Sequence, residues 1–83
     1  MPNHRLYVYL RPYCHLCHEL LNQLAPYQTR YGLEITPIDI DTDTELEARY
    51  GAYIPVLTGA DDTEICHYFL DEAALTAYLT KIR

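Results

Sequence analysis

The chain has 83 residues, 49% of them hydrophobic, and a net charge of −6 at pH 7. This length predicts one small domain, residues 1–83, with enough apolar content for a single core. The six Lys and Arg residues are scattered, which disfavours nucleic-acid binding because phosphate affinity needs clustered basic side chains. No apolar run is long enough to span a bilayer, and residues 1–5 lack the apolar stretch of a secretory signal.

The first predicted elements are a strand and a long helix. Residues 6–10 are rich in β-forming types and predict a strand. From Cys14 onward, apolar residues recur with the spacing of one buried helical stripe. The residues of this stripe are Leu16, Leu20, Leu21 and Leu24. We expect Pro26 to kink or interrupt the helix because it lacks a backbone donor, and the pattern resumes to Tyr31 before Gly32 ends it.

The middle of the chain predicts an edge strand followed by a short helix. The strand covers residues 34–40 and contains Pro37. Proline within a strand is tolerated mainly at the edge of a sheet, so this strand is predicted to be an edge. Thr42 or Asp43 can cap the short helix over residues 44–50.

The last third of the chain predicts a β-hairpin and a closing helix. Strands over residues 55–58 and 64–68 are close enough in sequence to pair. Alternation along the second strand, through Tyr68, places Cys66 on one face, where we expect a buried, inert thiol. Asp71 is the predicted N-cap of the last helix. The apolar face of that helix consists of Ala74, Leu75, Tyr78, Leu79 and Ile82.

In order, these elements are β-α-β-α-β-β-α, which predicts an α/β protein. The first β-α-β unit implies parallel strands joined by a right-handed crossover, and the β-β-α unit completes the sheet. Helices on both faces make a three-layer α/β/α sandwich. Sheets of this kind bind ligands at the carboxyl ends of their strands, where the helix from Cys14 begins.

The C-x-x-C motif Cys14-His-Leu-Cys17 lies at this predicted strand-to-helix turn. Helix N-termini stabilise thiolates, so we expect Cys14 to be a nucleophile with a pKa below about 8.5. Arg11 can add positive charge nearby. Cys17, one turn into the helix, is expected to be shielded and to resolve a mixed disulfide on Cys14. Three cysteines is an odd number, which favours a reducing compartment and predicts a cytoplasmic location.

Residues near the motif each have two open interpretations. Tyr13 forms a wall of the substrate groove, or packs on a neighbouring loop. His15 donates a hydrogen bond or a proton near the Cys14 sulfur, or is a solvated helix residue. Pro55 follows a cis peptide bond facing Cys14, with the backbone of Ile54 pairing with an extended substrate, or it is an ordinary trans proline that starts a strand.

Cys14, Cys17 and His18 also allow two metal-related interpretations. They spell C-x-x-C-H, the attachment string of c-type haem, and they are ligand types suited to zinc. Haem attachment needs an oxidising export compartment and usually a second axial ligand, and the only Met is the initiator. A pair of thiols held on a helix does not easily close a tetrahedral zinc site. We therefore expect no bound metal and no bound cofactor.

Several motifs together resemble one known family. They are Arg11-Pro-Tyr-Cys14-His-Leu-Cys17, Asp39-Ile-Asp41, Tyr50-Gly51 and Tyr53-Ile-Pro-Val56. The chain is similar to the glutaredoxin-like family of the thioredoxin-fold superfamily, and closest to the small bacterial type with Cys-x-Leu-Cys.

That resemblance implies a thioredoxin fold with a mixed four-stranded sheet in the order 2-1-3-4. It implies that Cys14 is the nucleophile, that Cys17 is the resolving thiol and that Pro55 follows a cis bond. It also implies that Arg11 and Ile54 contact glutathione.

The chain departs from the family pattern where glutaredoxins hold glutathione. Tyr53-Ile-Pro55 stands in place of Thr-Val-Pro. Tyr68-Phe69-Leu70-Asp71 occupies the place of two glycines and a glutathione-binding carboxylate, so that bulky side chains replace both glycines while Asp71 matches the carboxylate. We interpret the protein as a monomeric dithiol oxidoreductase that reduces disulfide-containing proteins or glutathione mixed disulfides, with glutathione as a candidate reductant. Two alternatives stay open: a protein-disulfide reductase that ignores glutathione, and a non-enzymatic module that binds a metal or a partner.

Overall fold

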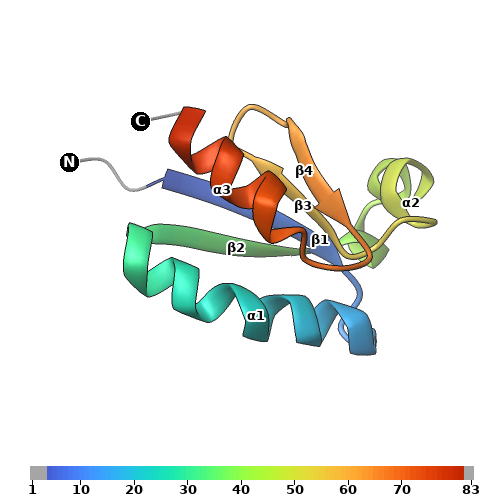
Figure 1. Ribbon diagram of the computed structural model, residues 1–83. Coiled ribbons are helices and arrows are strands. Elements are labelled where there is room, and N and C mark those ends of the chain that lie inside the picture. Colours follow the sequence, from blue (N-terminus) through green and yellow to red (C-terminus); the bar gives the residue numbers. More distant parts are fainter. Residues whose placement is uncertain (1–3, 82–83) are drawn as a thin grey trace.

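The computed structural model describes residues 4–81, which form a mixed four-stranded sheet and three α-helices (Figure 1). The strands are β1 His4–Leu10, β2 Leu33–Asp39, β3 Val56–Gly59 and β4 Glu64–His67. The helices are α1 His15–Tyr31, α2 Thr44–Tyr50 and α3 Glu72–Lys81, with a short 3-10 helix, η1, at Ile40–Thr42. The strand order β2-β1-β3-β4 confirms the predicted topology and the edge position of the strand that contains Pro37.

The register of the sheet brings the functional loops to one end. β1 runs parallel to β2, with Leu10 opposite Asp39, and antiparallel to β3, with Tyr9 opposite Val56. β3 in turn pairs with β4, with Val56 opposite His67. The loops that leave β1 and β2, enter β3 and leave β4 therefore lie at the same end of the sheet.

The helices cover the two faces of the sheet unequally. α1 and α3 share one face with the even-numbered residues of β1, and α2 packs at the other face with the odd-numbered ones (Figure 1). The larger core contains Leu6, Val8, Leu10, Cys17, Leu20, Leu24, Leu33, Leu57, Cys66, Leu75 and Leu79. The smaller core contains Tyr9, Ile40, Tyr50 and Val56. Ile82, assigned above to the apolar face of the last helix, lies outside the described residues.

Of the two predicted effects of Pro26, a kink or an interruption of the first helix, the interruption is wrong. α1 continues through Pro26 to Tyr31 and ends at Gly32, which adopts the left-handed conformation. Pro26 is exposed, so the carbonyl that loses its helical partner is on the solvent side and can bind water. Leu20 and Leu24 bury the opposite side of the helix against the sheet, and this packing outweighs the missing hydrogen bond.

The predicted strand over residues 64–68 ends one residue early. β4 stops at His67 because Tyr68 adopts a left-handed conformation with φ 65°, which breaks the alternation expected along the strand. Its backbone N–H donates to the carbonyl of Pro55, just before β3, at 2.9 Å. A left-handed conformation costs a residue with a side chain about 1–2 kcal/mol.

None of the helices within residues 4–81 is long and apolar enough to cross a lipid bilayer.

Gly59, at the end of β3, allows α3 to lie directly on the sheet. A β-carbon on Gly59 would overlap the phenol ring of Tyr78. We predict that Gly59→Ala lowers the free energy of unfolding by about 1–3 kcal/mol, because the ring must move out of its place. Urea titration of Gly59→Ala measures this cost, and the same change in a Tyr78→Ala background should cost clearly less. Equal costs in the two backgrounds would contradict this account.

Candidate active site

Cys14 lies at the N-cap of α1, where the sequence places it. The turn after β1 closes through a hydrogen bond from the N–H of Cys14 to the carbonyl of Arg11 at 3.1 Å. The Cys14 backbone is extended, with φ −91° and ψ 116°, and its Sγ accepts the N–H of Cys17 at 3.3 Å. The sulfur therefore accepts one of the donors that the helix N-terminus leaves without a partner.

Cys17 differs from Cys14 in exposure and in pKa. Its side chain is fully buried in the larger core, whereas Cys14 is partly exposed. Burial, followed by the interaction with Cys14, raises the pKa of the Cys17 thiol to about 12, although the charge of Arg11 opposes the shift. The pair therefore consists of an accessible sulfur at the helix end and a protonated thiol behind it.

An ionic network fixes the loop between β1 and α1. The Nε of Arg11 donates to Asp41 at 2.8 Å, and its other arm donates to Glu47 at 3.0 Å. The hydroxyl of Tyr13 donates to the second oxygen of Asp41 at 3.2 Å. These hydrogen bonds raise the pKa of Arg11 and direct its guanidinium to η1 and α2. The Nε and Nη2 groups of Arg11 are thus already bound within the chain.

His18 holds the same loop from the helix side. Its Nε2 donates to the backbone carbonyl of Pro12 at 2.7 Å, which requires a proton on that nitrogen. His15, by contrast, extends into solvent with 87% of its side chain exposed, and its Nε2 lies 3.7 Å from Glu19. A shallow depression lined by Pro12, Tyr13, Cys14, His15 and His18 surrounds the accessible sulfur.

The turn before β3 carries the second predicted element of the site. The Ile54–Pro55 peptide bond is cis. Ile54 packs against both hydrophobic cores, and Pro55 is buried. The hydroxyl of Tyr68 donates to the carbonyl of Ala52 at 2.8 Å, so the loop after β4 is tied to the loop that contains Pro55.

Asp71 and Cys66 take structural positions. The carboxylate of Asp71 caps α3 by accepting the N–H of Ala74 at 3.0 Å, as the sequence predicts. Cys66 is buried on β4, where burial raises the pKa of its thiol. In the part of the chain that the structure describes, His, Cys, Asp and Glu side chains form no group of three or more that could hold a metal ion.

Comparison with known proteins identifies the family. The sequence profile of the glutaredoxin-like domain family (DUF836) matches residues 5–80. The chain belongs to this family. Its Cys14–Cys17 pair therefore lies in a glutaredoxin-like domain with a thioredoxin fold. A search of curated proteins finds no match to this glutaredoxin-like protein.

Solved structures agree with this assignment. Protein Ne2328 from Nitrosomonas europaea is 38% identical over 94% of this chain and 93% of its own, with a TM-score of 0.86. Protein XcR50 from X. campestris is 36% identical over 92% of this chain and 96% of its own, with a TM-score of 0.73. The thioredoxin Deadhead from Drosophila melanogaster is 20% identical over 98% of this chain and 82% of its own. Its TM-score of 0.65 shows that the fold is shared.

Sequence reasoning missed the residues that hold the nucleophile's loop. Asp41 and Glu47 bind Arg11, and His18 binds Pro12, yet none of the three was assigned a role in this loop. The predicted parallel pairing of β1 and β2 could have indicated the ion pair between Arg11 and Asp41. Leu10 is opposite Asp39, so a cation just after the first strand meets a carboxylate just after the second.

The difference between the two thiols predicts selective alkylation. With limiting iodoacetamide at pH 8, the reduced protein should be modified at Cys14, whereas Cys17 stays protected because it is buried and protonated. The Cys17 pKa is raised, so its thiolate fraction and its alkylation rate should keep rising until the pH reaches about 12. Peptide mass mapping of protein quenched at short times measures both rates. Equal labelling of the two sulfurs at pH 8 in folded protein would contradict the assignment.

Proposed function

We propose that this glutaredoxin-like protein is a thiol–disulfide oxidoreductase that reduces disulfides by a dithiol mechanism. One observation carries the proposal. The Sγ of Cys14 is accessible and accepts the N–H of Cys17 at the helix N-terminus, while the Cys17 thiol is buried one turn behind it. Such an arrangement separates the role of attacking thiol from that of resolving thiol.

The first step is the attack of the Cys14 thiolate on one sulfur of a substrate disulfide. A bond forms between that sulfur and Cys14, and the other substrate sulfur leaves with the electron pair of the broken bond and takes a proton from solvent. The depression around Cys14 leaves room for this approach. In our proposal Tyr13 forms one wall, and the backbone of Ile54, beside Pro55, pairs with an extended substrate segment.

The second step is the release of the bound product by Cys17. Its thiol loses a proton to solvent, bonds to the Cys14 sulfur and expels the second substrate sulfur as a thiol. Two of the causes that raise the Cys17 pKa come from Cys14 itself. Burial, the largest cause, stays, but a mixed disulfide on Cys14 takes away both contributions of Cys14 and so lowers the Cys17 pKa relative to the reduced pair.

The balance of the two steps is a two-electron reduction of the substrate. Cys14 and Cys17 end as an internal disulfide, and an external thiol must reduce it, for which glutathione or a protein dithiol is the reductant class that we propose. No metal or bound cofactor takes part in this cycle. We propose a monomeric protein in a reducing compartment, with His15 as a solvated residue that is free to pass protons to the leaving thiol.

Intact-mass measurement across a glutathione redox series tests the proposal. Wild-type protein should lose two hydrogens reversibly, and Cys14→Ser should lose none. Cys17→Ser should accumulate a mixed disulfide with any disulfide substrate, because the resolving thiol is gone. Cys66→Ser is the matched control, since it removes a buried thiol on β4 and should behave as wild type. A wild-type protein that forms no internal disulfide at any potential in the series would refute the proposed function.

A further inference from the structure

The large apolar side chains that are exposed lie at the same end of the sheet as the dithiol. Within the described residues these are Tyr13, Tyr53, Tyr68 and Phe69, with exposed fractions of 77%, 49%, 40% and 67%. Tyr13 precedes Cys14, Tyr53 precedes the turn at Ile54, and the other two follow β4, so all four lie in the loops at one end of the sheet. Single exposed apolar residues are ordinary on a protein surface, but a group of them at the same end of the sheet as a reactive atom indicates an interaction surface.

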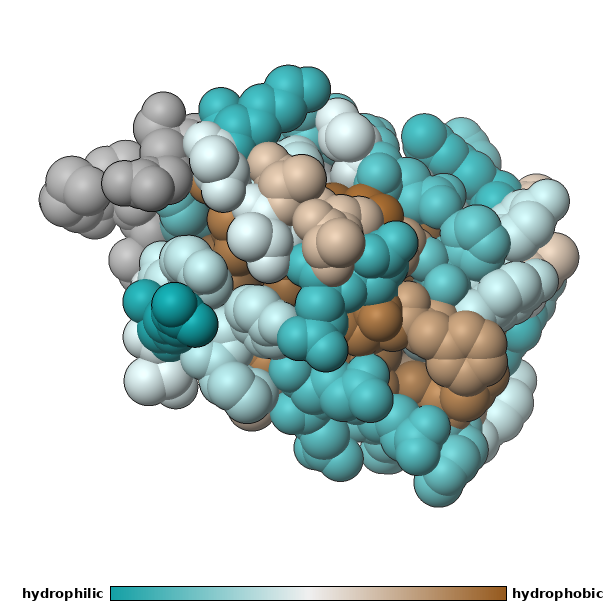
Figure 2. Space-filling model, in the orientation of Figure 1, coloured by the Kyte–Doolittle hydropathy of each residue, from teal (hydrophilic) through white to brown (hydrophobic). Residues whose placement is uncertain are grey.

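Three of these residues form a continuous aromatic surface with His67. The ring of His67 lies edge-on to Tyr53, with centroids 5.6 Å apart, and edge-on to Tyr68 at 4.8 Å. The ring centroids of Tyr68 and Phe69 are 6.5 Å apart. Figure 2 shows apolar residues at the surface where, in Figure 1, the loop after β4 faces the start of α1. We call Tyr53, His67, Tyr68 and Phe69 the aromatic rim.

Tyr68, at the centre of the rim, is held in place by two hydrogen bonds. Its N–H donates to Pro55 and its hydroxyl donates to Ala52. The strained left-handed conformation of this residue is therefore over-determined by its surroundings. A rigid aromatic surface binds a partner with little loss of conformational entropy.

Carboxylates surround the rim. An open depression of about 630 Å³ beside Phe69 and Leu70 is lined by Glu64, Asp71 and Glu72. Glu64 accepts a hydrogen bond from the ring of His67, and Asp71 accepts one from the N–H of Ala74. Glu72 accepts one from the hydroxyl of Tyr27. None of the ion pairs found within residues 4–81 joins these three carboxylates to Lys or Arg. The depression thus combines apolar walls with three carboxylates that form no ion pair with Lys or Arg, one of which, Glu64, lies 2.7 Å from His67.

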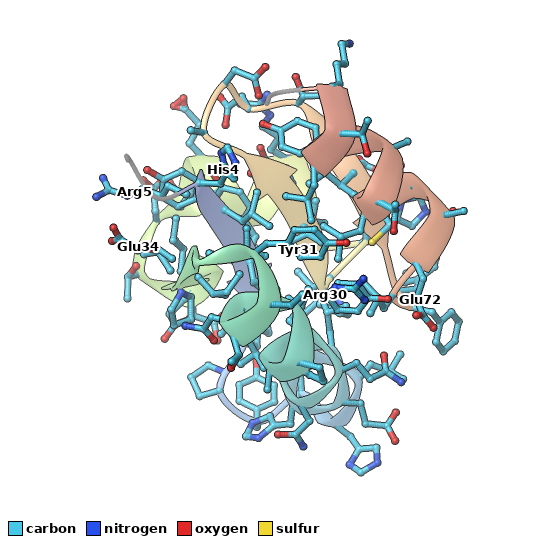
Figure 3. All side chains as sticks on the ribbon, turned by 60° about the vertical axis from the view of Figure 1, so that its left-hand side comes forward. His4, Arg5, Arg30, Tyr31, Glu34 and Glu72 are labelled. Carbon is cyan, nitrogen blue, oxygen red and sulfur yellow. The ribbon has the colours of Figure 1, made fainter. Side chains whose placement is uncertain are left out.

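Arg11 is already bound within the chain, and Arg30 lines a neighbouring depression together with Leu70 and Glu72. Arg30 takes part in none of the ion pairs found within residues 4–81. Arg11 is bound by both Asp41 and Glu47, which leaves that cluster with an excess negative charge. Arg5 pairs with Glu34 at the start of β1 and β2, and Arg30 lies over the ring of Tyr31 in the last turn of α1 (Figure 3). The 17 residues of α1 separate Arg30 from Cys14 by about 25 Å.

We propose that the rim and the acidic depression beside it form the docking surface for the disulfide substrate, and that this substrate is a polypeptide with Lys or Arg close to its disulfide. This inference rests on the proposed function and names the class of its substrate. A Lys or Arg side chain fits such a depression because its apolar stem packs along Phe69 and Leu70 while its cation faces the carboxylates. An anionic partner, such as an acidic peptide or glutathione disulfide, meets repulsion instead.

Single-turnover kinetics with matched peptide disulfides tests the inference. The two peptides have equal length, and each carries one cysteine as a mixed disulfide with a chromophoric thiol. In the basic peptide Lys and Arg flank the cysteine. In the acidic peptide Asp and Glu flank it. The Cys17→Ser protein attacks each peptide once, and release of the chromophore gives the second-order rate constant. We expect the basic peptide to react at least about tenfold faster at low ionic strength, and the ratio to fall towards one in 1 M salt.

Variants locate the preference on the surface. Glu64→Gln combined with Glu72→Gln, and separately Phe69→Ala, should each lower the basic-to-acidic rate ratio several-fold. Glu34→Gln is the matched charge control, since it removes one carboxylate at the far end of the sheet, and it should keep the ratio.

A small neutral disulfide separates the two proposals. If it reacts at Cys14 but the two peptides react equally, or if the acidic peptide or glutathione disulfide reacts faster, the docking inference is overturned and the proposed function stands. If no disulfide reacts at Cys14, both fall.

Discussion

The pairing of β1 with β2 on one side and β3 on the other is the constraint on which the site depends. Parallel pairing with β2 brings Asp41 beside the exit of β1, and antiparallel pairing with β3 brings the turn at Pro55 to the same end. A shift of one residue in either register would turn the alternate residues of β1 to the wrong face. The two hydrophobic cores, which use the even and odd residues of β1 separately, make such a shift costly.

The dithiol then acquires its asymmetry from a single helical turn. Cys14 is the N-cap residue of α1, and Cys17 lies in the first turn. The Cys14 sulfur therefore accepts a backbone hydrogen bond and is partly exposed to solvent, whereas the Cys17 sulfur is buried in the core. This difference needs no special side chain beyond the helix itself. Arg11, Asp41 and His18 serve to hold the loop in place, which keeps the Cys14 sulfur in line with the N–H of Cys17.

Much of the fold follows from local patterns. The helical stripe, the caps at Cys14 and Asp71 and the edge position of Pro37 each depend on residues close in sequence, and sequence reasoning located all of them. It failed where tertiary contacts override a local rule. Packing of α1 carries the helix through Pro26, and the Pro55 carbonyl holds Tyr68 in a conformation that usually belongs to glycine. The loop network around Arg11 was missed for the same reason, because its partners are some 30 residues away.

The burial of Cys66 changes which disulfides can form before and after the chain folds. In the unfolded state three free thiols allow three different disulfides, and the shortest loop is closed by Cys14 and Cys17. Once folded, β4 and α3 enclose Cys66, so an oxidant that meets the native protein finds only the helix-end pair. Folding therefore removes one of the three thiols from contact with dissolved oxidants, which leaves the accessible sulfur of Cys14 as the first point of attack.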